Sequence, residues 1–183
     1  MEEKSLILYV SAAPEMDVEC ELLGQTLARL TQLTQWTIKR TPAPHEHANP
    51  DLATLRRSHF YLILLGSDIV APIGVEWMAA REAQITLFAF RRVGTVPTPA
   101  AAFFAHNAGV TWERYTTPQE FIRRFERALI TQLVQGTPGY GLHLAEIESL
   151  AARLKELEQE DTPSEISEER RGAGRGGVIL PTV

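Results

Sequence analysis

Residues 60–66 read FYLILLG, a continuous apolar run that ends at a glycine. Such a short run is typical of a strand that is buried on both faces of a parallel sheet. Ser67 and Asp68 follow directly, so both are expected just past the carboxyl end of this strand. Because ligands of open α/β sheets bind outside these strand ends, the two residues are candidates for a binding site.

A carboxylate, Glu76, follows in the segment IGVEW at residues 73–77, where the sequence predicts the first turn of a helix. The helix dipole favours an ionised group at this place. Such a carboxylate can bind ribose hydroxyls or stabilise an oxocarbenium-like centre, as carboxylates do in glycoside cleavage. A carboxylate at a helix start is also common with no ligand at all, so both interpretations stay open. Trp77 either stacks on a base or belongs to the core.

The rest of the chain predicts strands that alternate with helices. Apolar runs predict four further strands, at residues 6–10, 36–40, 85–90 and 109–112. Helical spacing, Pro positions and acidic first turns predict helices at residues 14–33, 51–57, through 103–104 and at 118–135. Alternation through short loops predicts an α/β fold, a flavodoxin-like parallel sheet of five strands in the order 2-1-3-4-5 with helices on both faces.

The best-marked helix start is the segment Thr117-Pro118-Gln119-Glu120. It has the capping-box pattern with proline at the first helical position. We therefore expect the Glu120 side chain to bond back to the backbone N–H of the cap residue.

Composition excludes several classes of partner. The formal net charge is −5, and no basic stripe interleaved with aromatic residues supports nucleic-acid binding. No apolar run is long enough for a membrane span, and the N-terminus does not have the pattern of a signal peptide. Cys20 is the only cysteine, so no internal disulfide forms and a cytoplasmic location is expected. The helical position of Cys20 between two glutamates makes a reactive thiolate improbable.

Known motifs of this fold class are missing. The loop after the first strand, Ser11-Ala12-Ala13-Pro14, has no glycine and one hydroxyl, which argues against flavin binding. The aspartates and lysine of a receiver domain are not matched, and no dinucleotide, Walker A or serine-hydrolase motif occurs. The segment His45-Glu46-His47 has no third partner at a defined spacing, so we predict no metal site.

The strand ends resemble those of the TIR-like superfamily. The matching segments are Tyr9-Val10-Ser11, the acidic helix that follows, residues 62–68 and Gly74-Val75-Glu76-Trp77. The chain is more closely similar to the uncharacterised TIR-like domains N-terminal to bacterial STAND-type NTPases, and more distantly to nucleoside deoxyribosyltransferases. The resemblance covers about residues 5–135 and implies the TIR-like form of this sheet.

The resemblance also implies a site. In TIR domains that cleave NAD, a glutamate at the start of this helix acts on the ribose, and Glu76 is the residue that matches it. No cofactor is required, and NAD is the substrate that the resemblance suggests. The residues expected to bind a ligand around it are Ser11, Ala12, Ser67, Asp68, Gly74 and Trp77. The small polar residues usual before the glutamate are replaced by Ala71-Pro72-Ile73, which favours a module without activity.

A second segment follows the predicted domain of residues 1–135. Between residues 140 and 160, four apolar residues repeat in three- and four-residue steps and form an a/d seam, namely Ile147, Leu150, Leu154 and Leu157. This seam is an interaction surface that either packs on the domain or pairs with a neighbour, because so short a helix is marginal alone. Residues 161–183 are expected to be a flexible tail or linker, with an effector or NTPase domain as a candidate beyond it.

Two functions therefore stay open. The first is a TIR-like signalling or assembly module that binds a protein partner or itself, in bacterial defence or stress signalling. The second is an NAD glycohydrolase or nucleotide N-glycosidase that uses Glu76. A structural cap on a larger protein is a third, weaker alternative. A closed polar pocket at Glu76 would favour the enzyme, and a filled one would favour the module.

Overall fold

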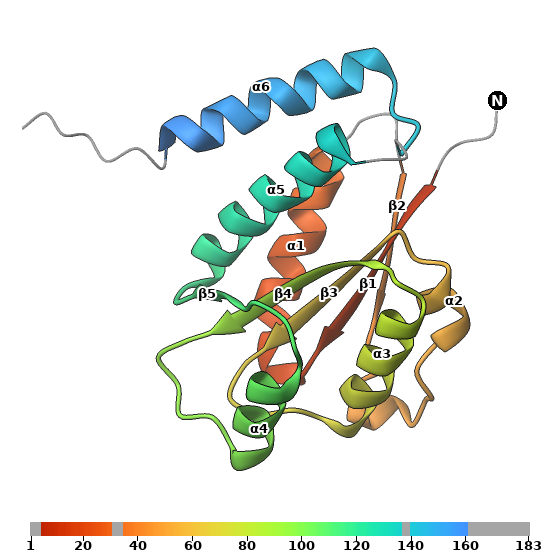
Figure 1. Ribbon diagram of the computed structural model, residues 1–183, viewed down its shortest axis with the longest axis vertical. Helices are drawn as coiled ribbons and strands as arrows, with labels where there is room; N and C mark the ends of the chain where they lie inside the picture. The colour runs from red at the N-terminus through yellow and green to blue at the C-terminus, as the bar shows by residue number, and fades with distance from the viewer. Residues whose placement is uncertain (1–4, 31–34, 137–139, 161–183) are drawn as a thin grey trace, which may run out of the picture.

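A computed structural model describes residues 5–30, 35–136 and 140–160 of the chain. Its centre is a parallel sheet of five strands in the order β2-β1-β3-β4-β5 (Figure 1). The strands are β1 (Ser5–Ala12), β2 (Gln35–Arg40), β3 (Phe60–Leu65), β4 (Thr86–Arg92) and β5 (Glu113–Tyr115). The predicted fold class and strand order are confirmed.

Helices cover both faces of this sheet. One layer holds α1 (Asp17–Leu30) and α5 (Pro118–Gln135), with α6 (Leu144–Glu160) lying against α5 on the outside (Figure 1). The other layer holds α2 (Leu52–Arg56), α3 (Ala71–Glu82) and α4 (Pro99–Asn107). Two short 3₁₀ turns, η1 (Pro14–Met16) and η2 (Pro44–Glu46), follow the first two strands.

Strand β3 forms the middle of the core, and all its residues are buried. Because side chains of a strand alternate between faces, Phe60, Leu62 and Leu64 pack with α1 and α5. Tyr61 and Ile63 pack on the opposite side with α3. Strand β3 is thus buried on both faces, as its apolar sequence predicts, and the Tyr61 side chain lies on the α3 side of the sheet.

The last strand differs from the prediction. It was expected at residues 109–112, but β5 spans Glu113–Tyr115. Residues 109–112 instead form the connection between α4 and β5. In this connection the Trp112 indole Nε1–H donates to the carbonyl of Ala105 in α4 at 2.8 Å. Gly109, at φ 68°, turns the chain in this connection. The apolar residues 110 and 112 therefore pack beside the sheet and do not form a strand.

Helix α3 begins earlier than the sequence indicated. It starts at Ala71, with Pro72 in its first turn, so Glu76 lies in the second turn and the first turn has no acidic residue. The prediction that Glu76 interacts with the helix dipole in the first turn is therefore wrong. At the end of α1, the predicted extension to residue 33 lies outside the described residues.

The start of α5 follows the predicted cap with one change. The Thr117 hydroxyl accepts from the backbone N–H of Glu120 at 3.2 Å, as a capping threonine does. The Glu120 carboxylate, however, accepts from the N–H of Thr116 at 2.8 Å and from its hydroxyl at 2.7 Å, instead of from the cap residue. These hydrogen bonds from Thr116, assisted by Arg124, lower the pKa of Glu120 to about 2.

Helix α6 packs on its own domain. Leu150 and Leu157 are buried in the core cluster of the α1 and α5 layer, and Leu154 packs partly against it. Arg153 bonds the carboxylate of Glu126 in α5 through two nitrogens, at 2.8 and 3.1 Å. Three of the four residues of the seam predicted from the heptad pattern therefore pack within the chain, on the side of α6 that lies against α5, whereas Ile147 is half-buried outside this cluster. The predicted tail at residues 161–183 lies outside the described part of the chain.

Candidate functional site

A buried carboxylate, Glu76, lies between α3 and the sheet and is fully inaccessible to solvent. Three hydroxyl groups donate to it: Tyr9 Oη at 2.8 Å from Oε1, and Ser11 Oγ and Thr41 Oγ1, each at 2.6 Å from Oε2. A fourth hydroxyl, of Tyr61, donates to Ser11 Oγ at 2.7 Å. We call these five residues the Glu76 cluster.

Strand geometry assembles the Glu76 cluster. Tyr9 and Ser11 are two residues apart in β1, so both side chains point to the α3 face of the sheet. Tyr61 is the register partner of Tyr9 in β3, and the two rings stack with centroids 6.3 Å apart. Thr41 directly follows β2, and its Oγ1 accepts from the N–H of Ala12 at 3.3 Å. This bond orients the Thr41 hydroxyl so that its proton points to Glu76.

The cluster satisfies a charge that is expensive to bury. A carboxylate without partners in an apolar interior would cost several kcal/mol, whereas short bonds from hydroxyls to a carboxylate are among the stronger hydrogen bonds in proteins. Burial, together with the nearby Glu76, raises the pKa of Tyr9 well above its usual range. Burial is also the main cause of the raised pKa of Tyr61. Both phenols therefore stay protonated, and they serve as hydrogen-bond donors.

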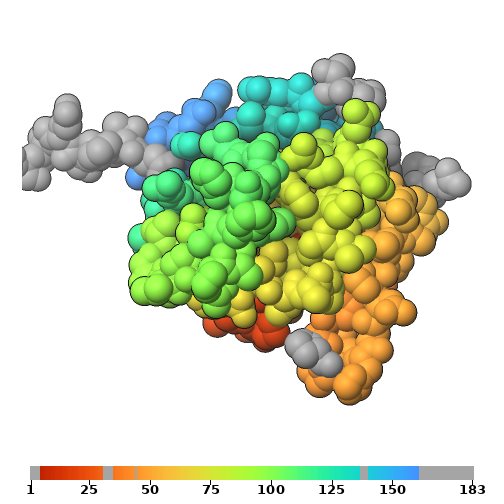
Figure 2. All heavy atoms as spheres, turned by 60° about the horizontal axis from the view of Figure 1, so that its bottom comes forward, coloured from red at the N-terminus to blue at the C-terminus, as the bar shows by residue number. Residues whose placement is uncertain are grey.

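A surface hollow of about 520 Å³ lies beside the Glu76 cluster, at the carboxyl ends of β1 and β2. Its lining includes Ala12, Thr41 and the ion pair between Arg40 and Asp17, whose atoms are 2.7 Å apart. Glu76 does not line the hollow, and Thr41 is 8% exposed. Thr41 therefore has both roles: it lines the hollow and bonds the buried carboxylate. Figure 2 views the molecule with this end turned forward, and the segment after β2 projects there.

The predicted ligand residues after β3 belong to a different group. Ser67 Oγ donates to Glu15 Oε2 at 2.6 Å, and the N–H of Asp68 donates to Glu15 Oε1 at 3.0 Å. Arg92, the last residue of β4, lies with Nη2 at 3.3 Å from Glu15 and Nη1 at 3.3 Å from Glu19. Ser67 and Asp68 are thus placed at the same sheet edge as Ser11, but their partner is Glu15 and not Glu76.

The sequence did not predict this second group. Glu15 and Glu19 belong to the acidic start from which the helix at residues 14–33 was predicted, yet Glu19 is fully buried and accepts from Tyr115 Oη at 3.2 Å. The available signal was the pair Arg91-Arg92, which follows the apolar run of residues 85–90. Parallel strands place such a residue at the same edge as the loop after β3.

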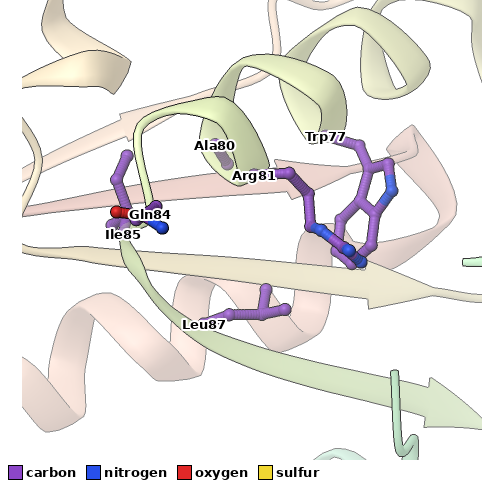
Figure 3. A pocket seen from close by; sticks show the side chains of 6 residues that line it. All are labelled: Trp77, Ala80, Arg81, Gln84, Ile85 and Leu87. Carbon is purple, nitrogen blue, oxygen red and sulfur yellow. The ribbon is translucent and has the colours of Figure 1, made fainter. Parts of the chain in front are cut away.

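The remaining predicted residues have other surroundings. Trp77 is 7% exposed and packs with Tyr61 and Phe104, with ring centroids 6.3 and 5.7 Å away. The Arg81 guanidinium lies 5.5 Å from the Trp77 ring. These two side chains line a hollow of about 210 Å³ beside β4 (Figure 3). Gly74 lies on α3 with open space where a Cβ would stand.

The described residues form neither a metal cluster nor a reactive thiol. Within residues 5–30, 35–136 and 140–160, no three histidine, cysteine or acidic side chains gather as metal ligands would. In the loop after β2, Glu46 accepts from the N–H of Ala43 at 3.0 Å. Cys20 is buried, and burial raises the pKa of its thiol to about 11. Among the described helices, none combines the length and apolar character needed to cross a membrane.

No family model matches the chain, and a search of the curated proteins found no match to it.

Proposed function

We propose that this chain is a TIR-like signalling and assembly module that acts through protein–protein contacts in bacterial defence or stress signalling. One observation carries the proposal: Glu76 is fully buried, and three hydroxyls of its own chain occupy its two oxygens. A carboxylate that acts on ribose needs an oxygen accessible to the sugar. In this arrangement Glu76 instead joins β1, the end of β2 and α3.

The surface of α3 supports a role in contacts. Val75 and Met78 lie one helical turn apart and are 52% and 62% exposed. Phe103 of α4, in the same layer, is 72% exposed. Helix α6 packs on α5, in the layer on the opposite side of the sheet from α3 and α4, so it does not cover these two helices. The proposed partner is a second copy of the chain or an effector domain that follows it.

The experiment combines sedimentation with an NAD assay. We expect the full chain to self-associate as its concentration rises, with no release of nicotinamide from NAD in the associated state. Met78→Glu should weaken association, whereas Glu82→Lys, an exposed change on the same helix, should have a smaller effect. Nicotinamide release that is lost in a folded Glu76→Gln variant would overturn the proposal, and so would a monomer at every concentration with no bound partner domain.

A second candidate function rests on Thr41. Because this residue both lines the 520 Å³ hollow and holds Glu76, a shift of the segment after β2 would connect the hollow to the carboxylate. The chain would then be an NAD glycohydrolase or nucleotide N-glycosidase with Glu76 as its catalytic carboxylate. Association would be the event that moves this segment, so activity should rise steeply with protein concentration if this function is correct.

A further inference from the structure

Three donors from two separate parts of the chain converge on the carboxylate of Glu15. They are the Ser67 hydroxyl at 2.6 Å, the N–H of Asp68 at 3.0 Å and Nη2 of Arg92 at 3.3 Å. A hydroxyl, a backbone N–H and a guanidinium are the groups with which proteins bind oxyanions. Together with Gly66, these residues form what we call the Gly66 cradle.

Gly66 leaves the space that the Glu15 carboxylate occupies. A Cβ at this position would overlap with the Glu15 carboxylate and with the end of the Met16 side chain. The absence of a side chain therefore lets an oxyanion lie directly against the backbone at the end of β3. Any larger residue at position 66 would close the cradle.

The cradle lies where this fold class binds ligands. In the order β2-β1-β3-β4-β5, the connections of β1 and β3 leave to opposite faces of the sheet, which makes a crevice at the carboxyl ends of these two strands. Glu15 belongs to η1, the turn after β1, and Ser67 and Asp68 follow β3. The Glu15 side chain therefore enters the crevice from one wall and bonds to the other.

The charges nearby define which anion fits. Arg92 also contacts the buried carboxylate of Glu19, to which Tyr115 donates. The Asp68 carboxylate, close to the cradle, accepts from the Thr98 hydroxyl at 2.8 Å and from the N–H of Ile69 at 2.8 Å. One cation and two further acidic groups make added negative charge unfavourable here, so an oxyanion with a single negative charge is favoured over one with two. Glu15 and Arg92 are 27% and 21% exposed, so solvent reaches the site.

We propose that the Gly66 cradle is an oxyanion-binding site whose resident ligand is the side chain of Glu15. A monoanionic carboxylate, or a phosphate group in its singly charged form, is the external ligand that competes with it. Binding of the external group displaces the Glu15 side chain from the end of β3, while Met16 keeps η1 packed in the core. The proposal is independent of whether Glu76 is catalytic.

The test removes the internal ligand from the full chain. Glu15→Ala keeps the donors of the cradle and should show a saturable rise in melting temperature with acetate, measured against chloride at the same ionic strength. The wild-type protein should need at least roughly tenfold more acetate for the same rise in melting temperature, because its tethered carboxylate competes at high effective concentration. Asp17→Ala is the matched control, since Asp17 is an exposed acid of the adjacent turn. It should respond like the wild type.

Further measurements distinguish a carboxylate ligand from a phosphate ligand, and one of them keeps the test valid if Glu15→Ala fails to fold. Inorganic phosphate titrated at pH 6 and pH 8 compares its singly and doubly charged forms, and the singly charged form should bind more tightly. Adding Ser67→Ala to Glu15→Ala should weaken the acetate response at least severalfold. If Glu15→Ala unfolds, its refolding yield should rise in acetate but not in chloride. Equal effects of acetate and chloride on stability, or on refolding yield, would overturn the proposal.

Discussion

Thr41, the first residue after edge strand β2, donates its hydroxyl to Glu76 of α3 at 2.6 Å while accepting from the N–H of Ala12 in β1. One side chain thus links the edge of the sheet, its neighbouring strand and the helix layer above. The link matters because β2 has no buried residue and, within the described sheet, pairs with β1 alone. An arrangement of this kind makes the carboxylate a structural centre as well as a candidate for chemistry.

Replacing Glu76 by glutamine should destabilise the domain. In the wild type, the hydroxyls of Ser11 and Thr41 donate to one oxygen of the carboxylate. A glutamine NH₂ group in place of that oxygen would set donor against donor. Breaking a buried charged hydrogen-bond group costs about 2–3 kcal/mol, and the free energy of unfolding from urea titration should fall by that amount. Glu82→Gln on the exposed end of α3 is the control and should change it by less than about 0.5 kcal/mol. Equal effects of the two variants would show that the cluster does not stabilise the fold.

Thr41→Val should show what the threonine hydroxyl alone contributes. Valine keeps the shape but removes one donor to Glu76 and the acceptor for the N–H of Ala12. We expect a loss of about 1–3 kcal/mol in the free energy of unfolding, with amide exchange becoming faster at Ala12. Thr41→Ser, which keeps the hydroxyl, should recover most of the loss. No difference between the valine and serine variants would contradict the role given to this hydroxyl.

The contrast between Glu76 and Ser67 shows how much of the site could be predicted from the sequence. Strand periodicity and the apolar run at residues 60–65 are enough to predict the sheet order and to bring Ser11, Ser67 and Glu76 to one edge. They do not predict which polar groups pair, because pairing depends on side-chain directions after each strand end. The turn η1, for example, carries Glu15 to Ser67.

The position of Glu76 in its helix illustrates a second limit. Helix α3 starts at Ala71, with Pro72 in its first turn, two residues before the first turn predicted at residues 73–77. The earlier start moves Glu76 from the first turn into the second, so the first turn of α3 has no acidic residue. The carboxylate bonds the hydroxyls of the sheet instead. The last strand was also predicted too early along the chain, at residues 109–112, whereas β5 spans Glu113–Tyr115.

Helix α6 should behave as part of the domain. Leu150 is 2% exposed and packs in the core cluster with α1 and α5, whereas Leu144 at the start of the helix is 71% exposed. Leu150→Ala should cost about 2–4 kcal/mol of unfolding free energy, and Leu144→Ala less than about 0.5 kcal/mol. Urea titration of both variants checks this. Should Leu150→Ala be neutral, α6 would be an appendage that docks only weakly.

The cap of α5 gives a prediction for acid conditions. The pKa of Glu120 in the folded protein, about 2, lies below its usual value of 4.5 because Thr116 donates two hydrogen bonds to it. A depressed folded pKa stabilises the fold above the unfolded pKa, and this stabilisation is lost as the pH falls through the folded pKa. Because the side chain is 23% exposed and solvent screens it, we expect about 1 kcal/mol, the size of a capping interaction.

The stability difference between the wild type and Glu120→Gln should therefore be constant from pH 7 down to about 5, and should disappear between about pH 4.5 and pH 2. Urea titrations at each pH measure it. Thr116→Val removes the hydroxyl donor but keeps the backbone N–H. In that background the difference should disappear at a higher pH, because the carboxylate is then easier to protonate. If the two backgrounds lose the difference at the same pH, the Thr116 hydroxyl is not what holds the Glu120 carboxylate in its ionised form.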